Sequence, residues 1–91
     1  MSTTSINSFN VGSNPIVVLP ANFLRHGAVI TNYSDTTEIF LAIGTGAVIG
    51  KGIVLMPQGS SYEIKKDNYF NGFIKAIGSS TVVGLVTTAE W

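Results

Sequence analysis

The sequence contains one histidine, His26, and histidine is the side chain that most often serves as a general base. A general base needs a group that orients it and a nucleophile to act on. His26 stands between Arg25 and Gly27 with no carboxylate nearby in the sequence, so only the fold could bring Asp35 or Glu38 to it. No nucleophile elbow accompanies the serines and threonines. We therefore expect no catalytic residues and no enzymatic activity.

The glycine-rich segment 44–52 resembles a phosphate-binding loop only in part. A Walker loop requires glycine where Thr45 stands and a magnesium-binding hydroxyl where Gly52 stands. A dinucleotide loop requires its third glycine where Ile49 stands, and no helix pattern follows that could hold a phosphate at its N-terminus. The segment is interpreted as a loop between two strands, and no cofactor is expected.

Side chains that could hold a metal ion are few and scattered. The sequence has no cysteine, and its carboxylates are Asp35, Glu38, Glu63, Asp67 and Glu90. These acids do not form the alternating run of a calcium loop, and Asp35 suits an Asx turn. We expect no metal site, and the lack of cysteine excludes a disulfide framework.

Five large apolar side chains outside the expected strands are the candidate site residues. They are Phe23, Leu24, Tyr69, Phe70 and Trp91. Such residues either cover the core or insert into a pocket of a protein partner, where tyrosine and tryptophan are common hot spots. An alternative is a platform that stacks sugars on the rings at positions 69, 70 or 91, although sugar sites usually add polar side chains beside the ring.

Length and composition indicate one small domain that packs against other subunits. Of its 91 residues, 45% are apolar and 11% are charged, with five cationic and five anionic side chains and a mean hydropathy of +0.38. This composition excludes a disordered chain, and the charge balance excludes the basic footprint of a nucleic-acid binder. A domain of this size buries only ~60–65% of its unfolded surface. We therefore expect it to complete its burial as a homo-oligomer.

Membrane insertion and secretion are not expected. The most apolar stretch, 39–56, is interrupted by Lys51, and its charge-free part, 39–50, is shorter than the ~20 residues of a spanning helix. The N-terminal segment has no basic region followed by an apolar core of signal-peptide length.

Runs of β-branched and aromatic residues between turn signals predict about eight short strands. The expected strands are 3–9, 16–19, 28–32, 38–43, 53–56, 61–64, 72–77 and 81–87. Their spacing predicts an all-β fold, either a small antiparallel β-sandwich or a jelly-roll-like barrel. The one stretch that could hold a helical turn is 20–26.

The chain divides into an N-terminal arm, 1–14, and a single β-sandwich domain, 15–91. The arm is rich in serine, threonine and asparagine, which suits an extended segment that orders only by adding to a neighbour's sheet edge. In the domain, the strands 16–19, 39–43 and 53–56 are apolar on both faces rather than alternating. We expect a neighbouring subunit to cover the second face, because the exposed patch would otherwise exceed what monomers tolerate. The alternative is that loops of the same chain wrap it.

A succession of turn and strand residues runs through the middle of the chain. It reads Arg25-x-Gly27-x-x-Ile30-x-Asn32-x-Ser34-Asp35, an apolar strand ending at Gly44, Gly52-Ile53-x-Leu55, Gly59 and Glu63-Ile64. Over residues 16–86 the chain resembles the small β-sandwich virion proteins of tailed bacteriophages. Where the family's pattern often has glycine, this chain has Pro57-Gln58-Gly59, which leaves the turn intact.

The resemblance implies a capsid decoration (cement) protein, or a tail, spike-base, vertex or head-fibre component. It implies a non-enzymatic homotrimer that binds the major capsid protein or other virion proteins, in a virion assembled in the bacterial cytoplasm, and it supplies no catalytic residues. The low net charge agrees, because many identical copies can then crowd together. A sugar-binding β-sandwich for recognition of the host surface is the alternative from another class.

Overall fold

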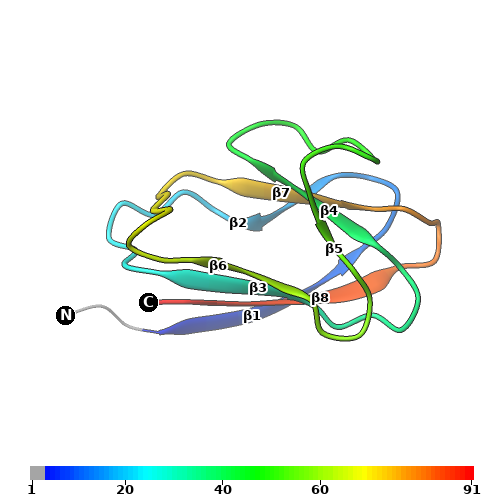
Figure 1. Cartoon of the computed structure of the whole chain (residues 1–91), viewed down its shortest axis with the longest axis horizontal. Helices are drawn as coiled ribbons and strands as arrows, with labels where there is room; N and C mark the ends of the chain where they lie inside the picture. The colour runs from blue at the N-terminus through cyan, green and yellow to red at the C-terminus, as the bar shows by residue number, and fades with distance from the viewer. Residues whose placement is uncertain (1–3) are drawn as a thin grey trace.

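The computed structural model describes residues 4–91, which form eight strands and no helix (Figure 1). The strands are β1 (Ser5–Val11), β2 (Ile16–Leu19), β3 (Ala28–Asn32), β4 (Ile39–Ile43), β5 (Ile53–Leu55), β6 (Ser61–Ile64), β7 (Ile74–Gly78) and β8 (Gly84–Glu90). They form two antiparallel four-stranded sheets, in the orders β1-β8-β3-β6 and β2-β7-β4-β5. The predicted β-sandwich is confirmed, and the sheets do not close into a barrel. Within residues 4–91, no helix has the length and apolar character needed to cross a bilayer.

Strands far apart in the sequence pair in a regular order. β1 pairs with β8, β2 with β7, β3 with β6 and β4 with β5, so the chain is arranged like one long hairpin folded over into two layers. This is the connectivity of a jelly roll. It brings the β2–β3 and β6–β7 connections and the end of β8 to one end of the sandwich (Figure 1). The β1–β2, β3–β4, β5–β6 and β7–β8 connections lie at the other end.

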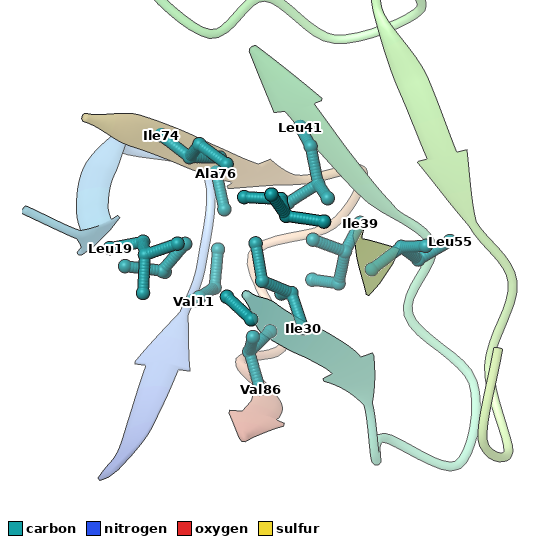
Figure 2. Close-up of a cluster of buried hydrophobic side chains, with 12 residues drawn as sticks. Val11, Leu19, Ile30, Ile39, Leu41, Leu55, Ile74, Ala76 and Val86 are labelled. Carbon is teal, nitrogen blue, oxygen red and sulfur yellow. The ribbon is translucent and has the colours of Figure 1, made fainter. Parts of the chain in front are cut away.

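Alternate side chains of the strands point between the two sheets and form the core. The members labelled in Figure 2 are Val11, Leu19, Ile30, Ile39, Leu41, Leu55, Ile74, Ala76 and Val86. The pairing register places Leu41 beside Ala76, so a large side chain lies next to a small one within the same sheet. Burial of an aliphatic side chain contributes ~1.5–3 kcal/mol, and this burial holds the two sheets together.

The observed strand bounds lie within three residues of the predicted ones, and the largest difference is at β8. The predictions 16–19, 28–32 and 61–64 match β2, β3 and β6 residue for residue. β8 begins at Gly84 rather than at Thr81, because Val82 and Val83 belong to an exposed connection. At Gly84 a Cβ would lie 2.9 Å from the Cβ of Ser34, so only glycine allows this close approach.

The helical turn allowed for 20–26 does not form. Asn22 instead makes a single tight turn, in which its carbonyl accepts from the N–H of Arg25 at 3.1 Å. Its side-chain Oδ1 accepts from the N–H of Leu24 at 3.0 Å. An asparagine that bonds to the backbone two residues on favours a turn over a helix.

The second apolar face of the sheet β2-β7-β4-β5 is covered in part by the chain's own β4–β5 loop. Ala47 of this loop packs against Ala42 and Ile77 on the outer face. Val17 and Val54 on the same face stay exposed. The interpretation that a loop of the same chain covers this face is therefore correct for its middle. For the rest of the face, cover by a neighbouring subunit stays a prediction.

Most of the predicted N-terminal arm belongs to a sheet of its own chain. β1 pairs with β8 from Ser5 opposite Glu90 to Val11 opposite Gly84. Val11 is fully buried and Phe9 packs against the core, because their alternate positions both point between the sheets. Residues 5–11 thus pair within the chain, in contrast to the expectation that the arm orders only on a neighbour. Residues 1–3 lie outside the described part.

Candidate binding surface

Four of the five candidate residues gather at the end of the sandwich where β2 connects to β3. Phe23 and Leu24 form the tip of that connection and are 81% and 79% exposed. Tyr69 Oη donates to the carbonyl of Arg25, and the backbone of Trp91 pairs with that of Gly27. We call this surface the Arg25 end; it comprises Phe23, Leu24, Tyr69 and Trp91.

The buried side chain of Arg25 holds the tip in place from beneath. Its Nη1 donates to the carbonyls of Phe70 at 3.0 Å and Gly72 at 3.1 Å. Its Nη2 donates to the carbonyl of Pro20 at 2.5 Å and to Oε2 of Glu90 at 3.3 Å. One guanidinium therefore joins the β2–β3 connection, the β6–β7 loop and β8, a task that suits its rigid fork of donors.

Glu90 completes this arrangement from β8. Its Oε1 accepts from Nδ2 of Asn22 at 2.6 Å, and its Oε2 forms the ion pair with Arg25. A buried charge is costly unless it is paired and hydrogen-bonded. Arg25 and Glu90 are paired with each other, and each forms further hydrogen bonds, although Nε of Arg25 has no partner within residues 4–91. The pair is neutral overall, so it contributes no net charge beneath the exposed tip.

Trp91 lies directly over Gly27. A Cβ at position 27 would lie 2.8 Å from Cζ2 of the indole and 3.0 Å from the carbonyl oxygen of Ile64. The two backbones exchange hydrogen bonds, Trp91 N to Gly27 O at 3.0 Å and Gly27 N to Trp91 O at 3.1 Å. Glycine at position 27 therefore allows the indole to pack on the backbone, while 37% of Trp91 stays exposed.

We expect Gly27→Ala to displace the indole of Trp91, the only tryptophan in the sequence. Overpacking of this kind costs ~1–3 kcal/mol of the free energy of unfolding. The displaced indole becomes more hydrated, so its fluorescence emission should shift to longer wavelength. Gly46→Ala is the control, because a Cβ there meets nothing within 4 Å. Unchanged emission and urea midpoint in Gly27→Ala would contradict the packing described.

Phe70 is placed differently from the other four candidates. Its ring packs against the core and against two glycines: a Cβ at Gly72 would lie 2.7 Å from the ring, and one at Gly44 3.0 Å. Its carbonyl, rather than its ring, contacts Arg25. Phe70 therefore covers the core, which was the other interpretation of these aromatic residues.

Sequence reasoning assigned no role to Arg25, Glu90 or Asn22. Arg25 is the only arginine in the sequence, which was the one available signal. Glu90 comes near Arg25 only because β8 pairs with β3, where Glu90 lies opposite Ala28. No spacing along the sequence reports that register.

The opposite end of the sandwich is held together by Asn32, which is fully buried. Its Nδ2 donates to the carbonyls of Thr37 at 2.8 Å and Leu55 at 2.7 Å. Its Oδ1 accepts from the N–H of Ser34 at 3.0 Å and from the Ser34 hydroxyl at 2.5 Å. Thr37 in turn donates its hydroxyl to the carbonyl of Val82 at 3.1 Å. These contacts fix the β3–β4 turn against β5 and the β7–β8 connection.

The residues considered for catalysis or metal binding do not meet. His26 is exposed at one end of β3, and Asp35 and Glu38 follow the other end of that strand. Across residues 4–91, no three side chains of the metal-ligating types gather. The segment 44–52 forms the β4–β5 loop, in which Gly50 and Gly52 have positive φ.

The Arg25 end therefore presents an apolar tip on a turn whose base is fixed by hydrogen bonds. Such an arrangement is suited to bind a complementary apolar pocket on another macromolecule. Comparisons with protein-family models, with curated proteins and with solved structures found no match.

Proposed function

We propose that the chain is a non-enzymatic virion structural protein of a tailed phage, a capsid decoration protein that binds and stabilises the head shell as an oligomer. The observation that carries the proposal is the tip formed by Phe23 and Leu24, which project into solvent from a turn held by the buried Arg25. Two adjacent large apolar side chains at such exposure are unfavourable in water and favourable in a partner's pocket.

The mechanism is bridging between neighbouring capsid subunits. The tip inserts into an apolar pocket of the major capsid protein, and the bonds of Arg25 keep the turn in one conformation before binding. A turn that is already ordered loses less conformational entropy on association. Many copies on one shell then add modest contacts through multivalency. The net charge of zero allows these copies to lie side by side.

Two alternatives use the same end of the molecule. A tail, spike-base, vertex or head-fibre component would insert the same tip into another virion protein. A sugar site would stack a ring on Tyr69, Phe70 or Trp91. The Tyr69 hydroxyl already donates to the backbone carbonyl of Arg25, the indole of Trp91 packs on Gly27, and the Phe70 ring packs against the core. A protein pocket is therefore favoured over a sugar.

The test combines Phe23→Ser with Leu24→Ser and measures co-sedimentation with heads of the encoding phage that lack this protein. A hot-spot residue contributes ~2 kcal/mol or more to binding, so the double variant should bind at least ~30-fold more weakly. Its unfolding midpoint should stay close to that of the wild type, because both side chains are exposed.

The matched control is Val82→Ser with Val83→Ser, two adjacent exposed apolar residues in a connection at the opposite end. This control should bind heads as the wild type does. Equal binding by the tip variant and the wild type would refute the proposal, as would an equal loss in the control.

A further inference from the structure

Three of the four sheet edges carry features that oppose pairing with another strand. β5 has only three residues. β2 contains a register shift and lies between two prolines. β6 carries Glu63 and is followed by two lysines. Short strands, bulges, prolines and charges are the ordinary means by which proteins prevent association at sheet edges.

The fourth edge, β1, has none of these features. It has seven residues and pairs with β8 in unbroken register along its whole length. Its sequence, Ser-Ile-Asn-Ser-Phe-Asn-Val, contains no charge, proline or glycine. Ile6 in the middle of its exposed half is 76% exposed. A long, regular and uncharged edge of this kind is a template for another strand.

We propose that β1 pairs in antiparallel fashion with β1 of a second copy of this chain, about a two-fold axis that passes at Ser8. The pairing joins the β1-β8-β3-β6 sheets of the two copies into a single sheet of eight strands. In this register all seven residues of each β1 are paired, with Ile6 opposite Asn10 of the second copy and Ser8 opposite its own equivalent. Residues that face outward in one copy then meet outward-facing residues of the other, as strand geometry requires.

The second copy is the occupant that the edge features favour. A two-fold pairing uses both β1 strands at once, so the eight-stranded sheet ends in β6 at both sides. Both new edges then carry Glu63 and its neighbouring lysines, and no unprotected edge is left to extend the assembly. The pairing also brings no like charges together, because residues 1–24 contain no charged side chain.

Small side chains at the axis allow the close approach that pairing needs. Ser8 is the first member of a row of hydroxyl residues that crosses the outer face of the sheet. The row consists of Ser8, Thr87, Thr31 and Ser61. In the dimer it continues through Ser8 of the second copy at the usual strand spacing of ~4.8 Å.

This inference rests on the proposed function, in which the chain acts as an oligomer, and it names the surface through which the copies associate. It is tested on the chain alone, without capsids. It departs from the trimer implied by the resemblance, because a two-fold pairing yields a dimer. The contact is one strand wide, so its affinity should be modest and its population should depend on concentration.

The experiment measures molecular mass by sedimentation over a concentration series for the wild type, Ser8→Lys, Ser8→Glu and Ser61→Lys. Charges at position 8 meet across the axis, and like charges held together at an interface strongly disfavour association, so each Ser8 variant should dissociate at least ~10-fold more readily than the wild type. Ser61→Lys, in the same row but on the β6 edge, should dimerise as the wild type does. An equimolar mixture of the two Ser8 variants should regain the dimer, because lysine then faces glutamate.

Each outcome of this experiment either supports or overturns the proposed β1 pairing. A wild-type dimer that both Ser8 variants lose and their mixture regains supports the proposal, and the regain shows that the variants are folded. A wild type that stays monomeric throughout, or that is a trimer, overturns it. So does a dimer insensitive to Ser8, an equal loss in Ser61→Lys, or a mixture that stays monomeric. A capsid-binding tip with no self-association would overturn this inference and leave shell binding by the tip standing.

Discussion

Arg25→Met should lower the free energy of unfolding by ~3–5 kcal/mol, the range found when one partner of a buried ion pair is removed. Methionine replaces the aliphatic stem of arginine but cannot donate to the carbonyls of Pro20, Phe70 and Gly72. It also leaves Glu90 without its cation in a half-buried site. Small domains have a total stability of about 5–15 kcal/mol, so the loss should be visible as a large shift of the urea midpoint.

Two further variants separate charge from hydrogen bonding at Arg25. Arg25→Lys keeps the charge but loses the planar fork, so its stability should fall between those of the wild type and Arg25→Met. Adding Glu90→Leu to Arg25→Met should restore part of the loss, because no unpaired carboxylate is then left. A loss below ~1 kcal/mol in Arg25→Met would show that the buried guanidinium does not hold this end together.

Asn32→Ala should destabilise the domain by ~2 kcal/mol or more. The amide of Asn32 satisfies the carbonyl of Leu55 and the N–H of Ser34, whereas the carbonyl of Thr37, its third partner, also accepts from the Ser34 hydroxyl at 2.7 Å. Each buried group left without a partner costs ~1–3 kcal/mol. Asn32→Asp keeps the shape but replaces the two donors with an oxygen that faces both carbonyls. At neutral pH we expect it to be less stable than Asn32→Ala.

The measurement for Asn32 is urea or thermal unfolding of both variants beside Asn10→Ala. Asn10 is an exposed asparagine on β1, and its replacement should change stability by no more than ~0.5 kcal/mol. If Asn32→Asp proved as stable as the wild type, the donor role assigned to the Asn32 amide would be wrong. Head binding through the Arg25 end should persist in any folded Asn32 variant, since the two networks lie at opposite ends.

The strands could be predicted from the sequence because each is bounded by residues with strong turn preferences. The run 28–32, for example, lies between Gly27 and a polar turn, and it matches β3 residue for residue. The start of β8 could not be predicted, because Val82 and Val83 have strand propensity but lie in a connection. The strand begins at Gly84, which packs closely against Ser34, and a contact between segments so distant in the sequence cannot be predicted from local propensity.

The exposed residues of the Arg25 end could be predicted from the sequence, but the buried hydrogen bonds that support them could not. Large apolar residues in connections suggest a binding role by type alone, and Phe23 and Leu24 are indeed exposed. Phe70 has the same residue type and the same kind of position, yet it packs against the core. Arg25 is buried because three segments distant in the sequence meet around it, so no local sequence pattern predicts its burial. Likewise, the side chains of Asn32 and Ser34 form their hydrogen bond only in the closed β3–β4 turn, so the role of this pair could not be predicted from the sequence.

The pairing of β1 with β8 sets the order in which this protein can fold during synthesis. β1 leaves the ribosome first, yet its partner strand is made only after nearly the whole domain has been translated. Until then β1 lacks the strand that it pairs with in the folded domain. Among the strands of residues 4–91, only β4 and β5 are both consecutive and paired, so only they can form early as a hairpin. The nascent chain therefore exposes an uncharged strand throughout translation, and neighbouring ribosomes on one messenger would hold several such strands close together. Slow initiation, which spaces those ribosomes, should favour correctly folded product over aggregates.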